Sequence, residues 1–155
     1  MDVKYLNPFI EAFTAVMPQV GFGTAEIGGI TVRDSKSVSA SGIIVVLGIV
    51  GDISGNVVYT LDEDAAKSIA SAMMMGMPIE ELDDMAKRAL SELTNMLTAT
   101  AATGFAGLGI AADISTPTMM QSDSISIKMS TQQVLCARLL ADGIPLEIHV
   151  SLEMK

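Results

Sequence analysis

Residues 82–97 contain the clearest helical pattern of the chain, Leu-Asp-Asp-Met-Ala-Lys-Arg-Ala-Leu-Ser-Glu-Leu-Thr-Asn-Met-Leu, because their apolar side chains recur at helical spacing. They make one stripe along a helix: Leu82, Met85, Ala86, Ala89, Leu90, Leu93, Met96 and Leu97. Such a stripe anchors a helix on a neighbouring layer of structure. We expect this helix to cover about residues 78–103, with Glu80 and Glu81 at its positive end, and to pack on a sheet.

Strand patterns dominate the rest of the chain. A first helix is expected over residues 7–17, where Pro8 favours the first turn, and Asp62 is expected to cap another that reaches about residue 75. Strand-like stretches cover residues 25–33, 41–50, 56–61, 124–130, 134–140 and 145–154. The pattern predicts an α/β (α+β) protein in which an antiparallel sheet packs with two long helices.

The last of these stretches alternates strictly. Leu146, Ile148, Val150, Leu152 and Met154 point to one side, and Glu147, His149, Ser151 and Glu153 point to the other. The turn dipeptide Asp142-Gly143 precedes it. This alternation predicts a sheet with one buried face and one solvated face.

Length and composition exclude several classes of protein. The 155 residues fit a single domain over 1–155, and their formal net charge of −9 disfavours both nucleic acid and free phosphate as ligands. The hydrophobic fraction of 50% suggests a buried sheet and an apolar contact between subunits. The longest apolar stretch, residues 42–50, is far shorter than the ~20 residues that a membrane span needs. No secretory signal is recognisable at the start, so we expect a cytoplasmic protein.

A second face of the long helix carries polar and small side chains: Asp84, Arg88, Glu92, Asn95, Ala99 and Ala102. Glu92 and Asn95 are three residues apart, so both heads can enter one crevice of a partner protein. The two alanines beyond them leave room for that partner to approach closely. The alternative is that Glu92 and Asn95 are ordinary solvated residues on an exposed helix face.

The Glu-x-x-Asn spacing of Glu92 and Asn95, with Pro117 downstream, resembles the signature of the CheC/CheX/FliY family of chemotaxis phosphatases. Residues 1–13, Met-Asp-Val-Lys-Tyr-Leu-Asn-Pro-Phe-Ile-Glu-Ala-Phe, are similar to the start of CheX-like members, and the resemblance covers essentially the whole chain. It implies hydrolysis of the aspartyl phosphate of a CheY-like response regulator. Asn95 would orient the attacking water, and Glu92 would pair with a lysine of the receiver domain. No metal or cofactor would be bound by this chain, because the Mg²⁺ belongs to the receiver.

We also expect partner contacts at Arg88, Ala99 and Pro117. Arg88 departs from the family, which often has Asp or Ser four residues before the Glu, and it could instead pair with Asp84 or Glu92. A homodimer formed by joining sheet edges is implied as well.

A weak internal repeat is visible, because residues 47–61 parallel residues 139–152 in their hairpin pattern. The first helix has Glu11-Ala-Phe-Thr14 where the long helix has Glu92-Leu-Thr-Asn95. Thr14 lacks the amide, so we expect only the long helix to be catalytic.

Two other functions remain open. The chain could be a non-catalytic adaptor that binds a receiver domain or a flagellar-switch partner through the same helix. It could also be a purely structural dimerisation module.

The remaining candidates favour structural roles. His149 is expected to be an exposed structural histidine, Cys136 a small core residue, and Met73–Met75 with Met77 core packing or a subunit contact rather than a binding surface. The glycines of residues 104–109 follow a helix instead of opening one, so they do not form a phosphate loop. Asp113, Asp123 and Asp142 lack metal-site spacing and are expected in loops.

Overall fold

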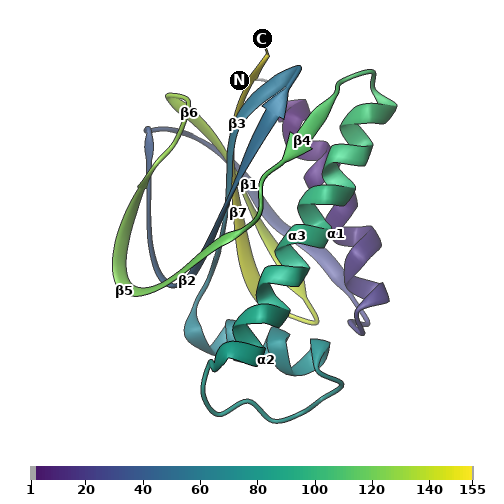
Figure 1. Cartoon of the computed structure of the whole chain (residues 1–155), viewed down its shortest axis with the longest axis vertical. Helices are drawn as coiled ribbons and strands as arrows, with labels where there is room; N and C mark the ends of the chain where they lie inside the picture. Colours follow the sequence, from purple (N-terminus) through teal and green to yellow (C-terminus); the bar gives the residue numbers. More distant parts are fainter. Residues whose placement is uncertain (1–2, 155) are drawn as a thin grey trace.

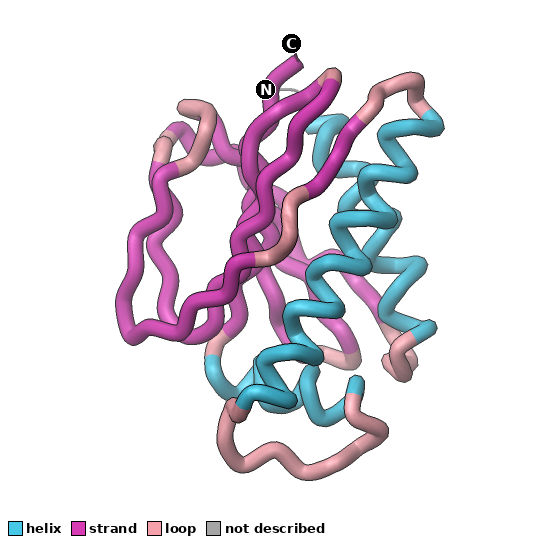
Figure 2. The backbone as a smooth tube through the Cα atoms, viewed as in Figure 1, coloured by secondary structure: helices cyan, strands magenta, loops and turns pink. Residues whose placement is uncertain are grey.

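The computed structural model describes residues 3–154, and the strands in this range form one curved antiparallel sheet (Figures 1 and 2). Residues 1 and 2, part of the stretch that resembles CheX-like members, lie outside the described residues, as does residue 155. The strand order is β1-β6-β7-β3-β2, and β4 and β5 both pair with the other side of β2.

The elements follow one another in the chain as a short 3-10 helix (Val3–Leu6), α1 (Asn7–Gln19), β1 (Ala25–Asp34), β2 (Ser37–Gly51), β3 (Ile53–Leu61), α2 (Glu63–Met73), α3 (Asp84–Gly107), β4 (Ala112–Ile114), β5 (Thr118–Lys128), β6 (Gln133–Ala141) and β7 (Ile144–Met154). The predicted fold class, an antiparallel sheet packed with helices, is confirmed. None of the helices within residues 3–154 is long and apolar enough to cross a membrane.

Helices α1 and α3 lie side by side over one face of the sheet (Figure 1). Phe105 near the end of α3 meets Phe9 of α1 edge to face, with ring centroids 5.9 Å apart. The main hydrophobic core fills the space between these two helices and the sheet. Helix α2 closes one end of this layer, and the Asp62 side chain accepts the backbone N–H of Ala65 at 2.7 Å, which confirms the predicted cap.

The predicted bounds of the long helix were wrong at both ends. Helix α3 begins at Asp84 because Asp83 is its cap, with the Asp83 carboxylate accepting the backbone N–H of Ala86 at 2.9 Å. Glu80 and Glu81 therefore lie in the preceding loop, not in the first turn. At the other end the helix continues to Gly107, past residue 103.

The apolar stripe is also narrower than predicted. Met85 leaves 59% of its surface exposed, and Met75 and Met77 in the loop before α3 are 98% and 53% exposed. The prediction of core packing is therefore wrong for Met75 and Met77, whereas Met73 is partly buried against the core.

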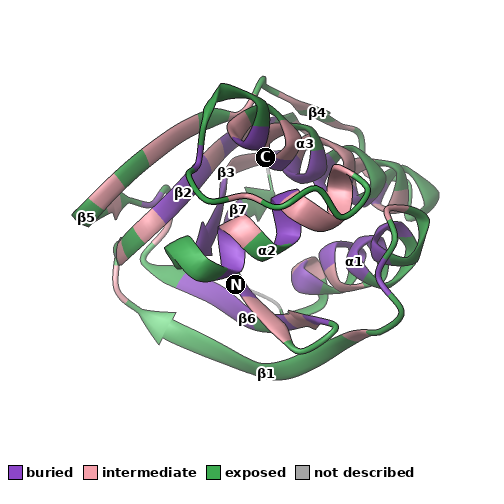
Figure 3. Cartoon of the chain, turned by 90° about the horizontal axis from the view of Figure 1, so that it is seen from below, coloured by how far each residue is buried: buried purple, intermediate pink, exposed green. Residues whose placement is uncertain are grey.

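The face of the sheet away from the helices is only partly solvated, because the β2–β5 pair curves back over it (Figures 1 and 3). Gly42 allows this bend: its φ is +99°, and a Cβ at this position would collide with the Leu61 carbonyl oxygen. A second, smaller core fills the curve and consists of Val38, Ile44, Val58, Met129, Val134 and Cys136.

This second core overturns part of the prediction for the last strand. His149 and Ser151 are buried, while Glu147 and Glu153 are exposed as expected. Ser151 accepts the backbone N–H of Thr131 at 2.6 Å from the segment that covers this face. On the helix side Met154, at the end of β7, is 51% exposed.

Two strands near residue 120 differ from the prediction. Strand β5 begins at Thr118, six residues earlier than expected, and the short strand β4 was not predicted. Asp113 and Asp123 consequently lie in strands, whereas Asp142 lies in the predicted turn.

Candidate functional site

Helix α3 is fixed by one buried face, made of Ala86, Leu90, Leu93, Thr94, Leu97, Thr98, Ala101 and Phe105. The Thr98 hydroxyl donates to the carbonyl of Thr94 at 2.8 Å, so the Tyr59 hydroxyl, 2.9 Å away, donates to Thr98. Burial raises the pKa of Tyr59 well above its ordinary value, which keeps this donor protonated. The hydrogen bond joins the middle of α3 to β3 and, together with the buried face, fixes the rotation of the helix.

That rotation leaves Glu92 exposed and Asn95 partly exposed on the outer side of α3, while Thr94 between them is buried. Within residues 3–154, neither head is held by a side-chain hydrogen bond or ion pair. A carboxylate and a carboxamide three residues apart on one helix are thus both accessible to a second protein.

The other predicted contact residues lie around this pair. Arg88 and Ala99 are exposed on α3, and Pro117 is partly buried between β4 and β5. Strand β4 and the start of β5 run beside α3 (Figure 1). Among the described residues Arg88 forms no ion pair, so the alternative pairing with Asp84 or Glu92 is not observed.

A groove of about 370 Å³ adjoins this face and was missed by sequence reasoning. It is lined by Asp84, Lys87, Arg88 and Ser91 of α3 and by Met119 and Gln121 of β5. Helical spacing could have placed Lys87 and Ser91 beside Arg88. Nothing in the sequence pattern could have added Met119 and Gln121, because the strand was expected to begin after them.

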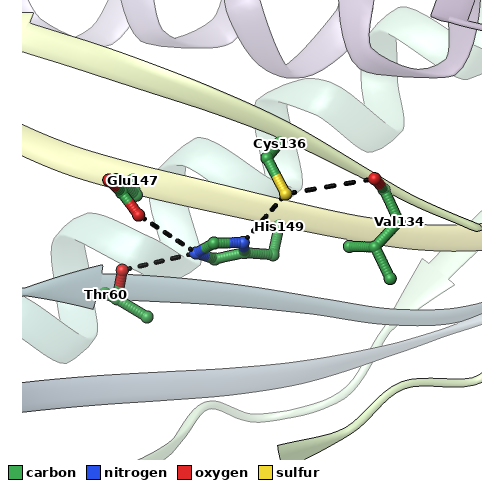
Figure 4. A network of polar contacts seen from close by, with 5 residues as sticks. All are labelled: Thr60, Val134, Cys136, Glu147 and His149. Atoms are coloured by element: carbon green, nitrogen blue, oxygen red, sulfur yellow. Dashed lines mark hydrogen bonds and ion pairs between the residues drawn. The ribbon is translucent and has the colours of Figure 1, made fainter. Parts of the chain in front are cut away.

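A separate polar cluster lies inside the sheet, where β3, β6 and β7 are neighbours (Figure 4). The Cys136 Sγ atom is 3.1 Å from His149 Nδ1, and His149 Nε2 lies 3.4 Å from the Thr60 hydroxyl and 3.5 Å from a Glu147 oxygen. The prediction of an exposed His149 was wrong, whereas Cys136 is the small core residue expected.

Cys136 and His149 are the residue types of a cysteine nucleophile and its general base, but their protonation states do not suit that role. Burial raises the pKa of Cys136. Burial, assisted by the nearby positive charge of Arg33, lowers the pKa of His149 to about 4. At neutral pH the pair is therefore a thiol and a neutral imidazole. The Cys136 thiol also donates to the Val134 carbonyl at 3.9 Å, and both ring nitrogens of His149 have polar partners, so the cluster is paired within the protein, as expected for a structural role (Figure 4).

Within residues 3–154 no three His, Cys, Asp or Glu side chains come together as ligands for a metal ion. The Glu92–Asn95 face of α3 combines an accessible carboxylate and carboxamide with an adjacent groove, and it is the candidate functional surface of the described residues. A family model described as chemotaxis phosphatase CheX matches residues 43–139, which include this face and Pro117. The chain belongs to the CheX family.

The similarity to one curated CheX relative is restricted to part of both chains. The CheY-P phosphatase CheX of Thermotoga maritima is 36% identical over 86 residues, which are 56% of this chain and 56% of that protein. The chain thus spans little more than half the length of the curated relative that it matches.

Solved structures of CheX proteins share the fold over nearly the whole chain. A chemotaxis protein CheX from Desulfovibrio desulfuricans has a TM-score of 0.83 at 20% identity and covers 98% of this chain and 99% of its own. A CheC-like superfamily protein from Shewanella has a TM-score of 0.85 at 21% identity, covering 99% of both chains. The CheX–CheY–BeF3–Mg²⁺ complex from Borrelia burgdorferi has a TM-score of 0.77 at 21% identity and covers 98% of this chain and 99% of its own.

Proposed function

We propose that this chain is a phosphatase that hydrolyses the aspartyl phosphate of a phosphorylated CheY-like response regulator. The observation that carries the proposal is the joint exposure of Glu92 and Asn95 on α3, a helix whose opposite face is fixed in the core. Membership of the CheX family supports it, as does the existence of a relative named CheY-P phosphatase and of a complex in which a CheX protein is bound to CheY.

In this proposal Asn95 enters the receiver's active site and orients the attacking water. An aspartyl phosphate is already an activated bond, so a carboxamide that positions water is sufficient chemistry, as it is in GTPases. The amide offers a donor and an acceptor without adding negative charge beside the phosphoryl group. Its lack of intramolecular partners within the described chain leaves Asn95 available for this role.

Glu92 would pair with a lysine of the receiver and so fix the approach of α3. The Mg²⁺ that neutralises the phosphoryl oxygens would be held by the receiver, and this chain would bind no cofactor. Arg88, Ala99 and Pro117 would contact the same partner, with Ala99 exposing little more than backbone for close packing.

We further propose that the chain is cytoplasmic and forms a homodimer through a sheet edge. Strand β1 supports the dimer: it pairs with β6 on one side, is exposed along its length (Figure 3), and leaves Ile27, Ile30 and Val32 between 37% and 48% exposed. An edge strand with exposed apolar side chains is a ready partner for a second strand.

The test is dephosphorylation of phosphorylated receivers by the wild-type chain, Asn95→Ala and Glu92→Lys. We expect acceleration by the wild type only. Receiver binding that depends on phosphorylation, without faster phosphate loss, would select the adaptor instead. Unchanged rates in both variants would remove the assigned site.

A further inference from the structure

The groove between α3 and β5 lies on the same helix as Glu92 and Asn95. Its α3 wall consists of Asp84, Lys87, Arg88 and Ser91, so it runs along the two helical turns that precede Asn95. Ser91 is one turn before Asn95, and Arg88 is one turn before Glu92. A partner that lies along α3 at Asn95 can therefore also contact this groove.

The charge of the groove is opposite to that of the chain. The protein has nine basic residues against eighteen acidic ones, yet two of the nine, Lys87 and Arg88, are adjacent here. Neither forms an ion pair with any carboxylate among residues 3–154. Asp84 is the one acidic side chain in the lining, so the groove has a surplus of positive charge.

We propose that this groove binds an acidic segment of the phosphorylated receiver. The inference rests on the proposed function and extends it from the catalytic pair to the recognition of the partner. Arg88 presents a planar fork suited to a carboxylate, and Lys87 adds a second positive charge. Across the groove Gln121 offers hydrogen bonds, and the flexible thioether of Met119 adapts to the aliphatic part of the segment.

The contacts in the groove are separate from the chemistry at Asn95. Charges at the border of an interface mainly affect the rate of association and its dependence on salt. Loss of the two cations should therefore raise KM for the phosphorylated receiver and leave kcat unchanged. Loss of Asn95 should do the reverse.

The experiment compares the wild type with Lys87→Glu/Arg88→Glu over a range of phosphorylated receiver concentrations. We expect KM to rise about tenfold, with kcat within about twofold, since association rates among variants of one interface span one to three decades. Raising the salt concentration should weaken the wild type more than the variant.

The matched control is Lys36→Glu/Lys128→Glu, which changes the net charge by the same amount. Both side chains are exposed, and Lys128 is nine residues along β5 from Met119, roughly 30 Å away in an extended strand. We expect its KM to equal that of the wild type, and circular dichroism should show both double variants folded. An equal rise in KM for the control would assign the effect to net charge and overturn the proposal.

The remaining outcomes are distinct. If the wild type fails to accelerate phosphate loss, both the proposed function and the proposed role of the groove are contradicted. If the wild type is active but Lys87→Glu/Arg88→Glu keeps its KM or loses kcat, only the groove's role falls. Competitive inhibition by inorganic phosphate, abolished in that variant, would indicate a site for the released product and would overturn docking of a protein segment.

Discussion

The attachment of α3 to the sheet can be tested by shortening one buried side chain. Leu90 is 1% exposed and packs in the main core, so Leu90→Ala removes buried methyl groups and leaves a cavity. Such changes cost 2.7–5.0 kcal/mol in a well-studied core, and we expect about 3 kcal/mol here. For a domain of this length that lowers Tm by about 6–12 °C.

Met85→Ala is the control for this measurement. Met85 belongs to the same apolar stripe in the sequence, but its side chain is 59% exposed, so its truncation should change stability by no more than about 0.5 kcal/mol. Urea unfolding followed by circular dichroism measures both variants. Equal losses for Leu90→Ala and Met85→Ala would refute the observed rotation of α3, and with it the accessibility of the Glu92–Asn95 face.

Three further predictions concern the fold. The pKa of His149 is about 4 when folded and 6.5 in the ordinary imidazole, so the unfolded chain takes up the proton first as pH falls. The free energy of unfolding of the wild type should therefore drop by about 3 kcal/mol more than that of His149→Leu between pH 6.5 and pH 4. Parallel pH profiles of the two proteins would contradict this. Asp83→Ala removes the cap of α3 and should cost about 1 kcal/mol in urea unfolding, and no loss would argue against a helix start at Asp84. Gly55→Ala should lower the free energy of unfolding by more than about 1 kcal/mol, since a Cβ at φ +152° would collide with the Ser151 carbonyl oxygen; an unchanged Tm would contradict this close approach of β3 and β7.

Features that depend on local chemistry could be predicted from the sequence. Asp62 caps α2 because an aspartate before a helical pattern accepts its first free N–H groups. The turn at Asp142-Gly143 joins β6 and β7, as that dipeptide indicates, and the Asp142 carboxylate accepts the backbone N–H groups of Gly23 and Thr24. These hydrogen bonds lower the pKa of Asp142. Helical spacing placed Glu92 and Asn95 on an accessible face.

Features that depend on distant parts of the chain could not be predicted in this way. His149 alternates with apolar residues and so indicates a solvated face, but the curved β2–β5 pair and residues 129–134 cover that face. Gln121 lines the groove because β5 packs beside α3, and this contact between distant parts of the chain has no signal in the local sequence. Alternation along a strand predicts which side chains share a face. It does not predict whether another strand of the chain packs over that face.

A single-turnover experiment separates receiver binding from hydrolysis at Asn95. Phosphorylated CheY-like receiver is mixed with excess wild-type chain or Asn95→Ala, and the decay of the phosphoryl group is followed in a single turnover beside the affinity for the receiver. We predict that Asn95→Ala binds as the wild type does but hydrolyses the phosphoryl group on the order of 100-fold more slowly, the scale seen when one preorganised group is removed from an active site. Equal decay rates for the two proteins at saturation would contradict the assignment of Asn95 as the residue that orients water.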